Sequence, residues 1–231
     1  MFHVKRHEIL YPNDDMGMMF FNRNAMGIIF WFSCLIFLPI FSSQATMSVS
    51  LPGIEESVHR DEAMEQALFE LVNQLRADPP GFYHRVVQPY LQQETAIHFT
   101  ARYTHSLRKE MLNCPSLPAF RLDHRLQQTA LLLAKDIVDR QRGRLSHTMS
   151  NGVDFATRFR QAGIGCGAEN LYTGLHRTPE QVLVDWLVDE GVSDFGHRHN
   201  LLNPQYRTTG IVVLKNSEGQ IWVVEDFGCA P

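Results

Sequence analysis

The feature that most constrains the fold is a change of hydrophobic pattern near the C-terminal end. Ile211 to Leu214 form an unbroken apolar run, residues 216–219 suit a turn, and residues 220–227 return as a second strand. A strand that is apolar throughout is covered on both faces, so helices must pack on both sides of its sheet. With a further strand expected at 168–174, the pattern predicts an α/β fold, a three-layer α-β-α sandwich with a small, mostly antiparallel central sheet.

Apolar residues at helical spacing mark the helices that would cover this sheet. The expected helices span residues 61–77, 122–142 and 178–190, with a short one inside 151–163. Residues 82–118 are expected to form short helical pieces and a loop.

The helix boundaries rest on particular residues. Pro79 ends the first helix and Gly143 stops the second. The helix over 178–190 is the clearest, because Thr178 and Gln181 form a capping box and Gly191 suits the C′ position.

Length and charge limit the class of protein. The 231 residues, 44% hydrophobic and 20% charged, suit one globular domain or one domain plus an extension. The formal net charge of -4 gives no electrostatic reason to expect nucleic acid or an anionic membrane as a partner.

The N-terminal segment resembles an export signal. Residues 25–41 are apolar and uncharged, Arg23 precedes them, and Ser43 and Ala45 suit a signal-peptidase site. We therefore expect a signal peptide over residues 1–45, with a later methionine as an alternative start because the leader is long. A linker over 46–60 and a domain over 61–231 would follow, in a secreted or periplasmic protein; the alternative is a retained N-terminal membrane anchor.

Three cysteines follow the predicted signal peptide, namely Cys114, Cys166 and Cys229. Export permits a disulfide, and the three thiols allow any of three single pairings. The count is too low for a disulfide-built scaffold, so a hydrophobic core must hold the fold.

Several titratable residues stand in apolar or glycine-rich settings. They are His147 in SHTMSNG, Glu169 in CGAEN, Asp189 and Glu190 in WLVDEG, and His197 and His199 in GHRHN. The two acids of WLVDEG lie at the C-terminal end of a predicted helix, where the helix dipole disfavours a carboxylate by about 0.3–1 kcal/mol. A position that costs stability is evidence for a task, and solvated surface acids are the alternative.

Five motifs in order resemble the CAP superfamily of cysteine-rich secretory, antigen 5 and pathogenesis-related proteins, with its bacterial SCP-like members. They are ELVNQLRADPPGF, LSHTMSNGVDFATRF, AENLYTG, GHRHNLLNPQYRTTGIVV and WVVEDFG, and the similarity covers about residues 61 to 228. The resemblance implies an α-β-α sandwich, in agreement with the hydrophobic pattern.

The resemblance also implies a cleft that holds two histidines and two acids. By motif, this cleft tetrad is His147, Glu169, Asp189 and His197. Glu190 is the alternative to Asp189, because many members of the family have Glu at the position after the helical tryptophan, or no acid at all. His199 matches a variable position and is not carried over; a turn or short helix there would point His197 and His199 in different directions.

The resemblance implies a possible metal site as well. His147 and His197, with Glu169, would hold Zn2+ or another divalent ion. Two imidazole nitrogens are few for a tight site, so the expected affinity is modest and depends on pH. The alternative is a histidine–carboxylate network that orders the cleft without metal.

The function favoured by these observations is a ligand- or partner-binding module for a lipid-like or cell-envelope ligand. The first alternative is a metal-dependent hydrolase with Glu169 as the base, although no HExxH helix or GxSxG elbow occurs. A thiol version would use Cys166 with His147 as its base. The remaining alternative is a structural, exported interaction domain, so catalytic residues stay unassigned.

Overall fold

The computed structural model describes residues 57–229. The predicted signal peptide and most of the predicted linker lie outside these residues. The elements in chain order are β1 (His59–Arg60), α1 (Glu62–Ala77), α2 (Pro79–Phe82), a π-helix η1 (Tyr83–Val87), α3 (Gln88–Leu91), a 3₁₀ turn η2 (Glu94–Ala96), α4 (Ala101–Asn113), β2 (Arg121–Leu122), α5 (His124–Asp139), α6 (Phe155–Gln161), β3 (Gly167–Leu175), α7 (Pro179–Val188), α8 (Gly196–Leu202), β4 (Tyr206–Lys215) and β5 (Gln220–Cys229). Among these residues, no helix has both the length and the apolar character needed to cross a membrane.

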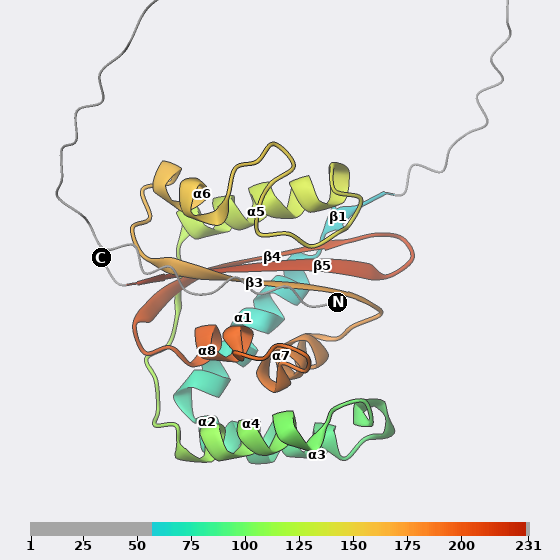
Figure 1. Cartoon of the computed structure of the whole chain (residues 1–231), viewed down its shortest axis with the longest axis vertical. Coiled ribbons are helices and arrows are strands. Elements are labelled where there is room, and N and C mark those ends of the chain that lie inside the picture. Colours follow the sequence, from blue (N-terminus) through green and yellow to red (C-terminus); the bar gives the residue numbers. More distant parts are fainter. Residues whose placement is uncertain (1–56, 230–231) are drawn as a thin grey trace, which may run out of the picture. The chain divides into compact units, whose positions relative to one another are not determined.

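The sheet is built around the predicted C-terminal hairpin. Its strand order is β1-β4-β5-β3, with β2 also beside β4. The β3, β5 and β4 pairings are antiparallel, and only β2 runs parallel to its neighbour. Figure 1 shows α5 and α6 on one side of this sheet, α1, α7 and α8 on the other, and α2, α3 and α4 beyond them. The predicted α-β-α sandwich with a mostly antiparallel sheet is confirmed.

Alternate residues of the hairpin enter two separate cores. Val212 and Val224 pack with Leu133 and Ile137 of α5, while Val213 belongs to the core that α1 and α7 share. Burial on both faces is why these strands lack the polar alternation of a half-exposed sheet. The inference drawn from the apolar run at 211–214 is therefore correct.

Two boundaries differ from the prediction. Leu122, predicted as the first residue of a helix, lies in β2, and Asp123 caps α5 instead. The last two residues of the predicted linker, His59 and Arg60, pair with β4 as β1. Both strands are only two residues long, so neither carries a periodic signal that a sequence pattern could show.

The segment predicted as short helical pieces and a loop contains a longer helix. α4 spans 13 residues, yet only Leu107 and Met111 are buried on it. Such a narrow buried stripe on an otherwise polar helix explains why the prediction missed it.

The cysteines resolve into one bridge and one free thiol. Cys166 and Cys229 form a disulfide that joins the start of β3 to the end of β5, and Cys114 is free. Of the three pairings that the sequence left open, this is the one that the strand register brings together, because Gly167 pairs with Gly228 next to it.

Candidate functional site

The first histidine–acid pair joins a loop to the edge strand. His147 lies in the connection between α5 and α6, and its Nδ1 is 2.6 Å from Oε1 of Glu169 on β3. Asp136 of α5 holds this loop, accepting hydrogen bonds from the Ser150 amide and hydroxyl at 2.7 and 2.6 Å. Both members of the pair are buried, so the loop presents His147 to the strand in a fixed position.

An arginine that the sequence analysis did not identify completes this pair. Arg158 of α6 is 1% exposed; its Nη1 donates to the His147 carbonyl at 3.1 Å, and its Nη2 donates to Glu169 Oε2. Burial alone would raise the pKa of Glu169, but the charge of Arg158 and the hydrogen bond from His147 outweigh it and hold that pKa below its usual value. Glu169 is therefore a carboxylate with both oxygens occupied.

A second buried acid lies beside Glu169. Asp226 is its cross-strand partner on β5, and its Oδ2 accepts a hydrogen bond of 2.6 Å from the Thr129 hydroxyl. Burial, and then the neighbouring charge of Glu169, raise the pKa of Asp226 well above its usual value. The pKa values of the two adjacent acids are thus shifted in opposite directions.

The second histidine–acid pair lies where α7 leads into α8. His197 Nδ1 is 2.6 Å from Asp189 Oδ1, and the His197 amide donates to Asp189 Oδ2 at 3.0 Å. The Arg198 amide donates to the same oxygen at 3.4 Å. His197 is 0% exposed, and its ring stacks at 6.4 Å on Trp186 of α7. The short helix predicted for this segment places both ring and amide against the same carboxylate.

The end of α7 differs from the prediction. Asp189, not Gly191, is the residue in the left-handed conformation that ends the helix, with φ of 61°. A non-glycine residue there is uncommon and costs energy, and such residues cluster at functional sites. The turn aims the Asp189 carboxylate at the first amides of α8, which offsets that cost.

The structure also separates the two neighbouring acids. Glu190 turns away from the histidines, and its carboxylate accepts from the Thr100 amide at 2.9 Å, at the start of α4. Of these two acids, only Asp189 contacts His197. His199 is on the outer side of α8, with its Nε2 3.9 Å from Glu110 and 46% of its side chain exposed.

β3 connects the two pairs. Glu169 and Asn170 are consecutive residues, so their side chains leave the strand on opposite faces. Asn170 donates to the His197 carbonyl at 3.2 Å, and Asn200 donates to Asn170 at 2.8 Å. One edge strand thus anchors both histidines, and these two asparagines were not found by sequence reasoning.

The acids do not fit as metal ligands. Both oxygens of Glu169 and both of Asp189 already accept hydrogen bonds, from His147, Arg158, His197 and Arg198. Within residues 57–229 no group of three or more His, Cys, Asp or Glu side chains converges to hold a metal ion. The carboxylate–imidazole pairing itself is the arrangement that supports a metal-bound histidine from behind. Metal binding through His147 and His197 stays a prediction.

The occupied acids also limit the reactions this site can perform. A general base needs a lone pair within reach of the substrate water, and Glu169 has both oxygens engaged by buried donors. The thiol route is excluded, because Cys166 is in a disulfide.

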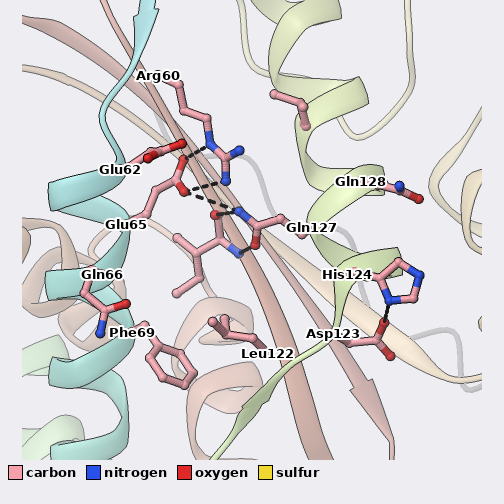
Figure 2. A pocket seen from close by; sticks show the side chains of 12 residues that line it. Arg60, Glu62, Glu65, Gln66, Phe69, Leu122, Asp123, His124, Gln127 and Gln128 are labelled. Carbon is pink, nitrogen blue, oxygen red and sulfur yellow. Dashed lines mark hydrogen bonds and ion pairs between the residues drawn. The ribbon is translucent and has the colours of Figure 1, made fainter.

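Two cavities of the described chain lie away from these pairs. One of about 650 Å3 lies between α1 and α5, lined by charged and polar side chains together with the apolar Phe69, Leu122 and Leu131 (Figure 2). Another of about 640 Å3 lies beside α4 and is lined by Cys114 and Glu110. Neither is lined by a member of the tetrad.

Comparison with known proteins identifies the family. The model of the cysteine-rich secretory protein family, CAP, matches residues 69–227, and the chain therefore belongs to that family. The similarity predicted from the five motifs is confirmed. A comparison with the curated proteins found no match.

Solved structures resemble the chain at low sequence identity. An extracellular SCP-domain protein from Bacillus anthracis str. Ames is 20% identical, with a TM-score of 0.47, over 74% of this chain and 41% of that one. The chain thus spans about two fifths of that protein. An outer surface protein from Borrelia burgdorferi is 17% identical, with a TM-score of 0.49, over 76% of this chain and 100% of that one.

Proposed function

We propose that this chain is an exported CAP-domain binding module whose two histidine–acid pairs order a binding face and catalyse no reaction. The observation that carries the proposal is that every oxygen of the two carboxylates already accepts a hydrogen bond. Glu169 accepts from His147 and Arg158, and Asp189 accepts from His197. Carboxylates and imidazoles with fixed hydrogen-bond partners hold the surrounding chain in one conformation. A carboxylate that acts as a hydrolytic base must first give up one of these hydrogen bonds to take a proton from water.

Export is the second part of the proposal. The disulfide between Cys166 and Cys229 supports it, because such bridges persist in oxidising compartments. The apolar run at 25–41 supports it as well, as the core of a signal peptide. These two features together support secretion or a periplasmic location.

The ligand class we propose is lipid-like or a component of the cell envelope. A cavity of about 650 Å3 with Phe69, Leu122 and Leu131 in its wall supports this class. Its volume lies in the range of roughly 300–1,000 Å3 that small-molecule sites occupy. A divalent ion, if it binds, would be held by the imidazoles of His147 and His197 and not by the acids.

The test compares lipid binding with hydrolysis in one set of variants. Wild-type protein and the His147→Gln and Glu169→Gln variants are titrated with the fluorescent fatty acid cis-parinaric acid and assayed against activated esters. A binding module takes up the probe in all three and turns over none of the esters. Ester turnover by the wild type that is lost in both variants would establish the hydrolase instead. Absence of both signals would support a purely structural domain.

A further inference from the structure

The outer edge of β4 is paired by strands only at its ends. β2 pairs with Thr208 and Thr209, and β1 pairs with Leu214 and Lys215. The stretch between them, residues 210–213, has no strand on that side within the described chain. Unpaired strand edges bind other extended chains, and folded proteins protect them in specific ways.

Side chains replace the missing strand. The side-chain amide of Gln127 accepts a hydrogen bond from the Ile211 backbone nitrogen at 3.0 Å, through Oε1. It donates one to the Ile211 carbonyl at 2.5 Å, through Nε2. These two bonds reproduce the pair that a residue of a neighbouring antiparallel strand would make. Val213 N donates to Glu65 at 3.0 Å, and Val213 O accepts from the Asp61 amide at 2.9 Å. All four edge groups of Ile211 and Val213 are thereby satisfied.

The substituting side chains are themselves held in place. Gln127 also donates to Glu65 Oε2 at 3.3 Å, and Arg60 donates to the two oxygens of Glu65 at 2.7 Å each. Figure 2 shows Glu65 reaching from the side of α1 and Gln127 from the side of α5, with dashed lines that join Glu65 to both Arg60 and Gln127. Glu65 is 8% exposed and the Arg60 side chain is 34% exposed, so the carboxylate at the centre of these contacts is shielded from water while the arginine outside it is partly solvated.

Gly210 allows Gln127 to reach the edge. A Cβ added at Gly210 would lie 2.2 Å from the backbone nitrogen of Gln127. The start of α5 can therefore lie directly on β4 only because this residue has no side chain. The close approach leaves Gln127 able to fold its amide over the strand edge.

The space in front of the gap is open and partly apolar. Gln127 and Ile211 line the cavity of about 650 Å3, and Leu122 at its border is 58% exposed. When the side-chain amide of Gln127 is removed, the backbone N–H and C=O of Ile211 become unpaired and face this space beside exposed apolar surface. That combination is the one that promotes edge-to-edge association.

We propose that the side-chain amide of Gln127 takes the place of a neighbouring strand and so closes the edge of β4. The partner that it excludes is the same edge of a second copy of this chain. The inference does not depend on the function proposed above. It assigns a role to Gln127, which lines the same cavity that supports the proposed ligand class, and it holds whether or not that cavity takes a ligand.

The experiment compares Gln127→Ala with Gln128→Ala in the full chain. Gln128 lines the same cavity and forms no hydrogen bond with β4, which makes it the matched control. Two quantities are measured: hydrogen exchange at the Ile211 amide, and molar mass by light scattering over a range of protein concentrations. In Gln127→Ala we expect exchange at Ile211 to accelerate roughly fivefold to tenfold, as for one lost hydrogen bond. We also expect a molar mass that rises with concentration above that of the wild type.

Gln128→Ala should match the wild type in both measurements. If Gln127→Ala does not fold, Gln127→Leu keeps the bulk of the side chain and removes both hydrogen bonds, and it takes the same two tests. Unchanged exchange at Ile211, or a molar mass equal to that of the wild type at every concentration, overturns the proposal.

Discussion

Replacing Arg158 with methionine should destabilise the protein more than any surface substitution. Arg158 supplies the cation beside the buried carboxylate of Glu169, and it also holds the carbonyl of His147. Methionine fills a similar space but carries no charge. Of the two donors to the buried carboxylate of Glu169 described above, only His147 then remains. Burial then raises the pKa of Glu169, because the arginine that countered it is gone.

The magnitude follows from the burial of the pair. Arg158 and Glu169 side chains are each 1% exposed, and removing one partner of such a pair typically costs about 3–5 kcal/mol. For a domain of this size, each kcal/mol lowers the melting temperature by roughly 2–4 °C, so the expected fall is roughly 6–20 °C. A cost of this size is a large share of the roughly 5–15 kcal/mol that stabilises a typical domain.

The assay is urea unfolding followed by tryptophan fluorescence at neutral pH. Arg160→Met on the same helix is the control, because Arg160 is exposed and bonds only to Thr157 nearby. A double variant, Arg158→Met with Glu169→Gln, removes both charges and should recover part of the lost stability. If Arg158→Met loses no more stability than Arg160→Met, or if the double variant is as unstable as the two single losses added together, the buried pair is not what stabilises this region.

The pH dependence gives an independent check on the same pair. In the wild type the pKa of Glu169 is lowered, so its contribution is present at neutral pH and is lost as the pH falls below its ordinary value of 4.5. In Arg158→Met the carboxyl takes up a proton more readily. The stability difference between the two proteins should therefore narrow as the medium becomes acidic.

Three further predictions concern stability elsewhere in the fold. Burial raises the pKa of Glu225 from 4.5 to about 8. The free energy of unfolding should therefore fall by up to about 1.4 kcal/mol per pH unit as the pH rises between these two values. Glu225→Gln should flatten that decline, measured by urea titrations at pH 5 and pH 8. Cys166→Ser opens a loop of 63 residues and should cost about 4 kcal/mol by chemical unfolding, whereas Cys114→Ser should change little. Thr178→Ala removes the capping box with Gln181 and should cost about 1 kcal/mol, measured as a lower melting temperature.

The fold was predictable where the hydrophobic pattern was strong. The apolar run at 211–214 predicted a strand buried on both faces, and its residues enter the two cores on opposite sides of the sheet. Short or polar elements gave no such signal: β1 and β2 span two residues each, and α4 buries only Leu107 and Met111. Tertiary packing, not local periodicity, holds these elements in place.

The histidine–acid tetrad came from motif similarity, while its supporting residues were missed. Arg158 resembles an exposed helical arginine in the sequence, although it follows Phe155 by three residues and so shares the buried face. Glu225 and Asp226 stand in a strand predicted to be covered on both sides, where an acid must be buried. That combination was a usable signal. No pattern, in contrast, indicated that Asn170 would bond to His197.

The role proposed for the two histidine–acid pairs depends most directly on which ring nitrogen of each histidine carries the proton. An ionised carboxylate only accepts hydrogen bonds, so Glu169 and Asp189 require protonated Nδ1 atoms on His147 and His197. Nitrogen-15 NMR of the imidazoles at neutral pH, assigned with His147→Gln and His197→Gln, measures this. We expect Nδ1 to be protonated in both rings. A deprotonated Nδ1 on either ring would leave its carboxylate free of that bond and would contradict the binding role proposed for the pairs.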